Sequence, residues 1–354
     1  MSRTRKWKRM MAVGVMTLPL VTAGCGLLAG EKNSQAIDPP QQQYETDPEK
    51  EQSSGLEEQA TAGSLMPLTV YLKDRGGYVA PVTIMTPQDE TEEAGRKALE
   101  MLVDEGAYAS ELPEGFEGLL PKGTQINGID LVKDQKLAIV DFSGPFADYN
   151  AAEERRMLEA VTWTLTGLPD VEQVQIWFEG APLNEMPVDG YPLNDPLSRG
   201  MGINLELGAG VSYSHSMPVT LYFSALSDEG EQYYVPVTRL VERDGERAKA
   251  ALQQLIEGPA RGVELNGVMT QDIEVKAVTV DGDTAVVELD DAAYEQGQPA
   301  PAEMLQAVVL SVTENSSASK VQIRVNGMSE VVDTENRSYS EPVERPDRVN
   351  ALKA

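Results

Sequence analysis

Few residues in this chain have the types and spacing that chemistry requires, and the only histidine is the first of them. His215 lies between Ser214 and Ser216, so a serine could be activated there as a nucleophile. No nucleophile-elbow motif surrounds the pair, and a single histidine excludes metal sites that need two histidine ligands. We therefore expect His215 to be a structural or exposed residue.

Carboxylates are the second group of candidates. Glu153, Glu154 and Glu159 could supply the two acids that cleave a glycosidic bond. They also begin a predicted helix, where acidic residues interact favourably with the helix dipole. Gln306 replaces Glu159 in the second copy of the repeat described below. We expect no catalytic residue here, and lytic activity is kept as the alternative.

Two further acidic patterns favour structural roles. Asp281-Gly282-Asp283 lacks the additional ligands of a calcium loop and is typical of a hairpin turn. Asp141 and Glu288 match between the two copies, but each lies in a predicted strand beside a turn.

The single cysteine excludes an internal disulfide and a cysteine-rich metal site. The sequence therefore predicts neither a metal nor a cofactor.

The first 25 residues have the layout of a lipoprotein signal. Residues 1–9 are basic, and the apolar run 10–23 is shorter than the roughly 20 residues of a membrane-spanning helix. The run ends in Thr-Ala-Gly before Cys25, which is similar to the bacterial lipobox, although Thr22 stands where that motif prefers leucine. We expect a signal peptide over 1–24 and acylation of Cys25, by palmitate or a related chain. An uncleaved signal anchor is the alternative.

A disordered tether is predicted over 25–65, because apolar residues are sparse there and show no period. About 40 flexible residues have an end-to-end reach on the order of 35 Å. The folded part is therefore expected to be lipid-anchored at the cell membrane, on its extracytoplasmic side.

The chain is strongly acidic. It has 57 Asp and Glu residues against 29 Lys and Arg residues, a formal net charge of −28. Such a surface repels phosphate backbones, so we expect no nucleic-acid partner. Aromatic residues make up only 6% of the chain, which disfavours an aromatic-lined platform for sugars or bases.

The remaining residues contain one unit written twice. The segment 66–71 (MPLTVY) recurs as 217–222 (MPVTLY), and 138–141 (AIVD) recurs 147 residues later as AVVE. Each tail carries an arginine followed four residues later by Ile or Val and then Asn. The period is too long for a solenoid, and each copy is long enough to bury a core. We predict two homologous domains, copy one over 66–207 and copy two over 215–352.

Hydrophobic periodicity predicts the same element order in both copies, β-β-α-β-β-α-β. In copy one, alternating apolar residues predict the strands, and apolar stripes predict two helices. The expected strands are 68–72, 79–85, 125–132, 137–142 and 173–178, and the expected helices are 91–103 and 152–166. Thr91 is the expected cap of the first helix. The fold class is therefore predicted as α+β, with tandem two-layer domains in which two helices cover a small sheet.

Three residues are candidates for partner contact. Arg199 and Arg345 occupy matching places in the two tails of an acidic protein. They are expected either to form an ion pair that holds the terminal segment or to contact a partner. Trp163 is expected in the core, whereas Trp177, in the last strand of copy one, is a candidate exposed aromatic residue.

These features resemble the GerM-like family of lipoproteins with tandem GerMN domains. The resemblance rests on the lipoprotein layout of 1–25, the duplicated pattern over 66–352, Leu-Ile-Glu-Gly-Pro at 255–259, Leu-Pro-Lys-Gly-Thr at 120–124, and the two tails. Copy two lacks the second of these elements and has Met-Thr-Gln-Asp at 269–272 instead. The resemblance implies a core similar to the ring-building modules of secretion systems. It also implies a Gram-positive, endospore-forming source and a role in sporulation, and by the older name in germination.

The expected function is that of a non-enzymatic scaffold or assembly factor of the complex that bridges mother cell and forespore. Its expected partners are the membrane, through Cys25, and proteins of that complex, with a place beside the peptidoglycan. Small open sheets leave unpaired backbone groups at their edges, so docking is expected through sheet edges or helix faces. The alternatives are an enzyme or cofactor of peptidoglycan remodelling and a ligand-binding lipoprotein.

Overall fold

The computed structural model describes residues 65–208, 210–243 and 245–353. The predicted signal peptide, Cys25 and all of the predicted tether except Leu65 lie outside the described residues. Within the described part, none of the helices has the length and apolar character needed to cross a bilayer.

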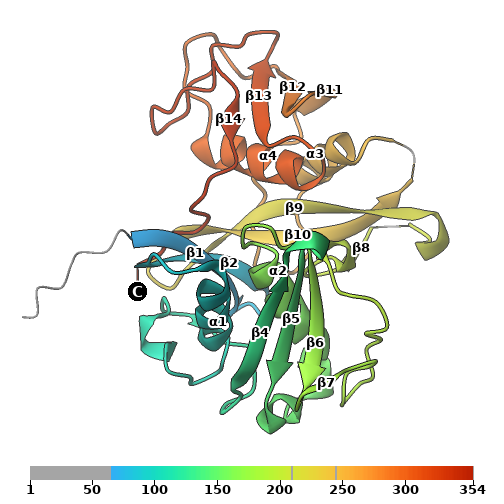
Figure 1. Cartoon of the computed structure of the whole chain (residues 1–354). Coiled ribbons are helices and arrows are strands. Elements are labelled where there is room, and N and C mark those ends of the chain that lie inside the picture. The colour runs from blue at the N-terminus through green and yellow to red at the C-terminus, as the bar shows by residue number, and fades with distance from the viewer. Residues whose placement is uncertain (1–64, 209, 244, 354) are drawn as a thin grey trace, which may run out of the picture. The chain divides into compact units, whose positions relative to one another are not determined.

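Copy one follows the predicted element order (Figure 1). Its elements are β1 (Leu65–Asp74), β2 (Val79–Pro87), α1 (Thr91–Met101), β3 (Phe116–Glu117), β4 (Ile126–Val132), β5 (Leu137–Phe142), α2 (Glu154–Leu165), β6 (Gln173–Phe178) and β7 (Ala181–Pro182). The strands β3 and β7 were not predicted, because a strand of two residues is too short to show a hydrophobic period. Thr91 is the first residue of α1 and Glu90 is its N-cap, without a side-chain hydrogen bond, so the predicted threonine cap is wrong.

Copy two repeats this order after the short connecting strand β8 (Glu206–Leu207). Its elements are β9 (Ser216–Leu226), β10 (Gln232–Glu242), α3 (Arg247–Glu257), β11 (Ile273–Asp281), β12 (Thr284–Asp291), α4 (Ala302–Glu314), β13 (Lys320–Val325) and β14 (Val343–Glu344). Short 3₁₀ helices occupy Ala109–Glu111, Lys133–Gln135, Gly144–Ala147, Ala151–Glu153, Arg199–Met201 and Tyr213–His215. The predicted α+β fold with two repeated domains is confirmed.

Each copy builds two sheets. The larger ones have the strand orders β4-β5-β6-β7 and β11-β12-β13-β14. Their central pairs, β5 with β6 and β12 with β13, are parallel, because a helix crosses over between the two strands. The first two strands of each copy form a separate hairpin sheet, β2-β1-β3 in copy one and β8-β10-β9 in copy two.

The helices lie between the two sheets of their copy (Figure 1). In copy one, α2 contacts both β1 and β6, and in copy two α4 contacts both β9 and β13. Ten of the twelve residues of α2 are buried, so this helix is covered on more than one side. The two predicted layers, helices on a sheet, are present, and the hairpin adds a layer on the opposite side of the helices.

Trp163 anchors the core of copy one. Its side chain is fully buried, and its ring centroid lies 5.6 Å from that of Tyr71 on β1. The indole Nε1 donates a hydrogen bond of 3.1 Å to the carbonyl of Gly202, in the tail of copy one. Trp163 therefore joins α2, the hairpin and the tail, and it is the core residue that its position predicts.

We expect Trp163→Ala to lower the free energy of unfolding by about 4 kcal/mol, because it leaves a large cavity and an unpaired carbonyl. Trp177→Ala is the matched control, since Trp177 is only partly buried, and it should lower the free energy by less than half as much. Urea denaturation of both variants measures the difference. Equal losses in the two variants would contradict the role given to Trp163.

Candidate functional site

The two hairpin sheets meet at the junction between the copies, and an asparagine from each tail joins them. The side chain of Asn204 accepts a hydrogen bond from the Val79 amide (2.9 Å) and donates to the Val79 carbonyl (2.8 Å). It also donates to the carbonyl of Pro236 in copy two (2.7 Å). One amide group therefore satisfies backbone groups of β2 and β10 together.

Asn350 repeats this arrangement from the opposite direction. Its side chain accepts from the Tyr234 amide (2.7 Å), donates to the Tyr234 carbonyl (2.8 Å), and donates to the carbonyl of Pro81 in copy one (2.7 Å). Both asparagines have left-handed backbones, with φ of 46° at Asn204 and 56° at Asn350, a conformation that asparagine adopts more readily than most residues. The junction therefore has an approximate two-fold symmetry, because the matching asparagines of the two tails make matching contacts.

Threonines extend the symmetry. Thr238 of copy two donates its amide to the carbonyl of Ile203 (2.8 Å), and its hydroxyl accepts from the Ile203 amide (2.9 Å). The equivalent Thr83 of copy one donates its hydroxyl to the carbonyl of Val349 (2.7 Å). Each tail is thus bonded to the hairpin of the other copy, which ties the two domains together twice.

The tail arginines converge on one carboxylate, Glu314 at the end of α4. Arg199 of copy one lies 3.0 Å from Glu314, and Arg345 of copy two lies 3.2 Å from it. Each arginine also donates a hydrogen bond to a threonine at the end of the second helix of its copy. Arg199 donates to Thr166 beside α2, and Arg345 donates to Thr313 in α4. These arginines therefore form the internal ion pair given as one alternative above, and a partner contact by either of them stays a prediction.

Aromatic rings complete the cluster. The guanidinium of Arg199 lies 4.5 Å from the centroid of Trp163, and that of Arg345 lies 5.2 Å from the centroid of Tyr222, within the range of cation–π attraction. Burial opposes ionisation of Glu314, but the charges of Arg199 and Arg345 outweigh it and lower the pKa of this carboxyl. The cluster is ionised at neutral pH.

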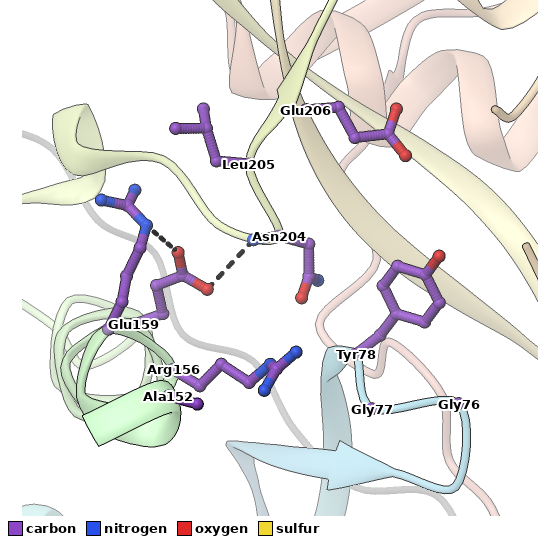
Figure 2. A pocket seen from close by; sticks show the side chains of 10 residues that line it. Gly76, Gly77, Tyr78, Ala152, Arg156, Glu159, Asn204, Leu205 and Glu206 are labelled. Atoms are coloured by element: carbon purple, nitrogen blue, oxygen red, sulfur yellow. Dashed lines mark hydrogen bonds and ion pairs between the residues drawn. The ribbon is translucent and has the colours of Figure 1, made fainter. Parts of the chain in front are cut away.

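A cavity of about 550 Å³ lies beside the junction (Figure 2). Its lining comes from the β1–β2 turn, the 3₁₀ turn before α2, α2 itself, and the segment that leads into β8. It consists of Gly76, Gly77, Tyr78, Ala152, Arg155, Arg156, Glu159, Asn204, Leu205 and Glu206. Figure 2 shows the Arg156 side chain extending toward the space that Tyr78 borders. Arg156 is partly exposed and pairs with Glu153 at 3.1 Å, so the cavity could offer guanidinium donors to an anionic or hydrogen-bonding group.

The catalytic candidates of α2 are engaged in structural contacts. Glu159 accepts from the Asn204 amide (3.0 Å) and lies 2.8 Å from Arg155, so it fastens the tail to the helix (Figure 2). Burial raises the pKa of Glu159. Burial acts in the same direction on Glu154, but hydrogen bonds from the Tyr149 hydroxyl and from backbone amides lower its pKa, which is the wrong direction for a general acid.

The remaining candidates lie apart from this cavity. Ser214 Oγ and His215 Nδ1 are 2.9 Å apart, but both residues are exposed, and Ser214 is also bonded to Ser212 within the same turn. Asp141 accepts from the Gly180 amide, and Glu288 pairs with Arg324 on the surface.

Asp281-Gly282-Asp283 forms the predicted hairpin turn between β11 and β12. A hydrogen bond from Thr284 and the charge of Lys320 lower the pKa of Asp283. Among the residues that the structure describes, no group of three or more His, Cys, Asp or Glu side chains is placed to hold a metal ion.

Sequence reasoning missed Glu314 and the asparagine side chains. Gly167 occupies the position of Glu314 in copy one, so the repeat gave no signal for this acid. The asparagines were visible as part of the tail motif, and their recurrence was the available signal.

Trp177 is partly buried, and its Nε1 is buried without a hydrogen-bond partner, so it is less open to a partner than an exposed aromatic residue would be.

Comparison with known proteins places this geometry in a family. The sequence profile of the Germane family, described as "Sporulation and spore germination", matches residues 69–184 and 220–331, once in each copy. The chain is also 32% identical to the spore germination protein GerM of Bacillus subtilis, over 98% of both chains. The chain belongs to the GerM family.

A solved structure of the tandem GerMN domains of the sporulation protein GerM from Bacillus subtilis has the same architecture. It superposes with a TM-score of 0.75 at 34% identity and covers 81% of this chain and 100% of the solved one. The resemblance stated from the sequence is therefore confirmed, and so is the tandem arrangement of this GerM-family protein.

We expect Asn204→Gly and Asn350→Gly each to lower the free energy of unfolding by about 2 kcal/mol. Glycine tolerates the left-handed backbone, so the loss reports the side-chain hydrogen bonds alone. Asn336→Gly is the matched control, because Asn336 has φ of 64° but is exposed. Thermal or urea unfolding measures all three, and a loss in the control as large as in the others would refute the clamp.

We expect Glu314→Gln to lower the free energy of unfolding by about 3 kcal/mol at pH 7, because two partly buried guanidinium groups lose their counter-charge. Folding lowers the pKa of Glu314 below its ordinary 4.5, so the stabilisation is present above that value and is lost as the pH falls through the folded-state pKa. The difference between wild type and variant should therefore shrink below about pH 4.5. Glu288→Gln, at an exposed pair, should change stability by less than about 1 kcal/mol.

Proposed function

We propose that this GerM-family protein is a non-enzymatic, lipid-anchored assembly factor of sporulation. In this proposal it holds proteins of the complex that bridges mother cell and forespore, and it acts from the extracytoplasmic face of the membrane. Membership of a family named for sporulation and spore germination supports the process. The scaffold role and the anchor are the new parts of the proposal.

The observation that carries the scaffold role is the double tie between the two domains. Asn204 and Asn350 each bond to both hairpins, and the Arg199–Glu314–Arg345 cluster joins the tail of copy one to the last helix of copy two. Such ties hold two binding modules in one relative orientation, which reduces the ordering penalty when both engage a partner. The polar groups that match between the copies thus serve assembly of the pair.

The anchor would act by raising local concentration. Acylation of Cys25 by two or more chains holds a protein firmly at a bilayer, since each buried methylene contributes about 0.8 kcal/mol. The predicted tether would let the domain pair reach partners above the membrane surface.

Sheet edges are the proposed docking elements. β4 and β11 are the outer strands of the two larger sheets, and within the described residues neither is paired on its outer side. Unpaired backbone donors and acceptors on such a strand can accept a strand from a partner.

One observation favours a second candidate, an enzyme or cofactor of peptidoglycan remodelling. Glu159 lines the cavity beside Arg155 and Arg156, and its pKa is raised, as in a general acid. Incubating the purified chain with isolated peptidoglycan, with Glu159→Gln as control, tests this. Release of muropeptides that depends on Glu159 would favour the enzyme over the scaffold.

The scaffold is tested by affinity capture from sporulating cells. The chain anchored through Cys25 should recover proteins of the intercellular complex, and the Cys25→Ala variant should recover several-fold less. The physical reason is that an unanchored chain is diluted away from membrane-bound partners. Western blots of both samples for total protein control for expression.

Two outcomes would count against this proposal. Recovery of no complex protein by the anchored chain would contradict the scaffold. Equal recovery by both forms would contradict the role given to the anchor and leave the docking intact.

A further inference from the structure

An apolar cavity of about 260 Å³ opens on copy two, where β12 and β13 end and α4 begins. Its lining is mostly apolar and includes Leu289, Ala293, Met304 and Val325, with one aromatic side chain of copy two, Tyr294, on its wall. The side chains of Leu289, Met304 and Val325 are buried, whereas Ala293 is exposed at the mouth. All of its lining residues belong to copy two, so the matching positions of copy one offer an internal comparison.

Copy one has phenylalanines at the sequence positions that match three lining residues of this cavity. Phe142, Phe146 and Phe178 stand 147 residues before Leu289, Ala293 and Val325. Phe146 is only 1% exposed and stacks on Phe142, with ring centroids 4.4 Å apart and planes 4° from parallel. The ring of Phe178 lies 6.4 Å from that of Phe146.

We propose that the cavity of copy two receives an aromatic side chain from a protein partner, in the place that Phe146 occupies in copy one. Apolar cavities of about 150 Å³ bind benzene, so a space of 260 Å³ accommodates one aromatic ring. This inference rests on the proposed scaffold function and names the kind of partner segment that it engages. Burial of an aromatic anchor in a pocket is a common source of affinity at protein interfaces.

The acidic residues around the cavity favour a partner segment in which basic residues flank the aromatic ring. Asp291 lines the cavity, and Glu295 is hydrogen-bonded to Gln298, another lining residue. The chain has a net charge of −28, so a second copy would bring like charge to this rim. The occupant is therefore an aromatic residue flanked by basic residues on a different protein.

Three blocked tripeptides test the proposal on the purified full chain in detergent micelles. They are Lys-Phe-Lys, Lys-Ala-Lys and Glu-Phe-Glu, and their binding is followed by NMR of ¹³C-labelled methionine methyl groups. Met304 lines the cavity and is the reporter, and its counterpart Met157, in the core of copy one, is the internal control.

Lys-Phe-Lys is expected to shift the Met304 signal in a saturable manner and to leave Met157 unchanged. The other two peptides should bind at least about tenfold more weakly, because one lacks the ring and the other has the wrong charge. This comparison uses the unmodified chain and does not depend on any variant.

Ala293→Phe should abolish the shift, since it restores in copy two the ring that fills copy one. Ala292→Phe is the matched control, because it adds the same ring at an exposed neighbour outside the cavity lining, and it should bind like wild type. An unchanged signal from Met217, a buried methionine of copy two outside the cavity lining, reports that each variant is folded.

Equal binding of Lys-Ala-Lys, or undiminished binding by a folded Ala293→Phe, would overturn the proposal. Equal binding of Glu-Phe-Glu would also overturn it, in favour of a pocket for a free aromatic ligand. Capture from sporulating cells separates this failure from that of the scaffold. If wild type and Ala293→Phe recover complex proteins equally, the scaffold stands without this pocket, and if wild type recovers none, the scaffold itself fails.

Discussion

Among the residues that the structure describes, the carboxylate of Glu314 is the one charged group that binds the arginines of both tails. It is buried between two arginines that come from the tails of different copies. Removing one partner of a largely buried ion cluster is destabilising, because the remaining charges are only partly hydrated. The asparagine clamps, the threonine contacts and the stacking of Arg199 on Trp163 all lie around it. These contacts hold the two domains in one relative orientation.

Duplication preserved some positions and changed others, and the changes are informative. The junction keeps Asn204 and Asn350 in equivalent roles, since each must satisfy backbone groups on both hairpins. Glu314 has glycine as its counterpart, because one carboxylate serves both arginines. The stacked phenylalanines of copy one are matched in sequence by leucine and alanine in copy two, where these residues line a cavity. The two domains thus share a scaffold and differ in the surface that a partner would meet.

Periodicity predicted most of the elements, because alternation and apolar stripes record which side of each element is buried. It did not predict that β1 and β2 form a sheet apart from β4, β5 and β6, since a hairpin has the same alternation in either sheet. It also missed the two-residue strands and placed a cap at Thr91. Glu154 and Glu159 were identified as candidate acids, but the opposite shifts of their pKa values could not be predicted, because the partners that cause them come from distant segments.

The sequence by itself determined the duplication, the element order, the acidic surface and the positions of the two tail arginines. These properties are local or periodic, so they can be read along the chain. Only the tertiary structure decided that Arg199 meets Glu314, 115 residues away, and that each asparagine bonds to both copies. The physical reason is that these pairings depend on how the two hairpins pack against each other. Such packing between distant segments produces no periodic pattern in the sequence of either segment.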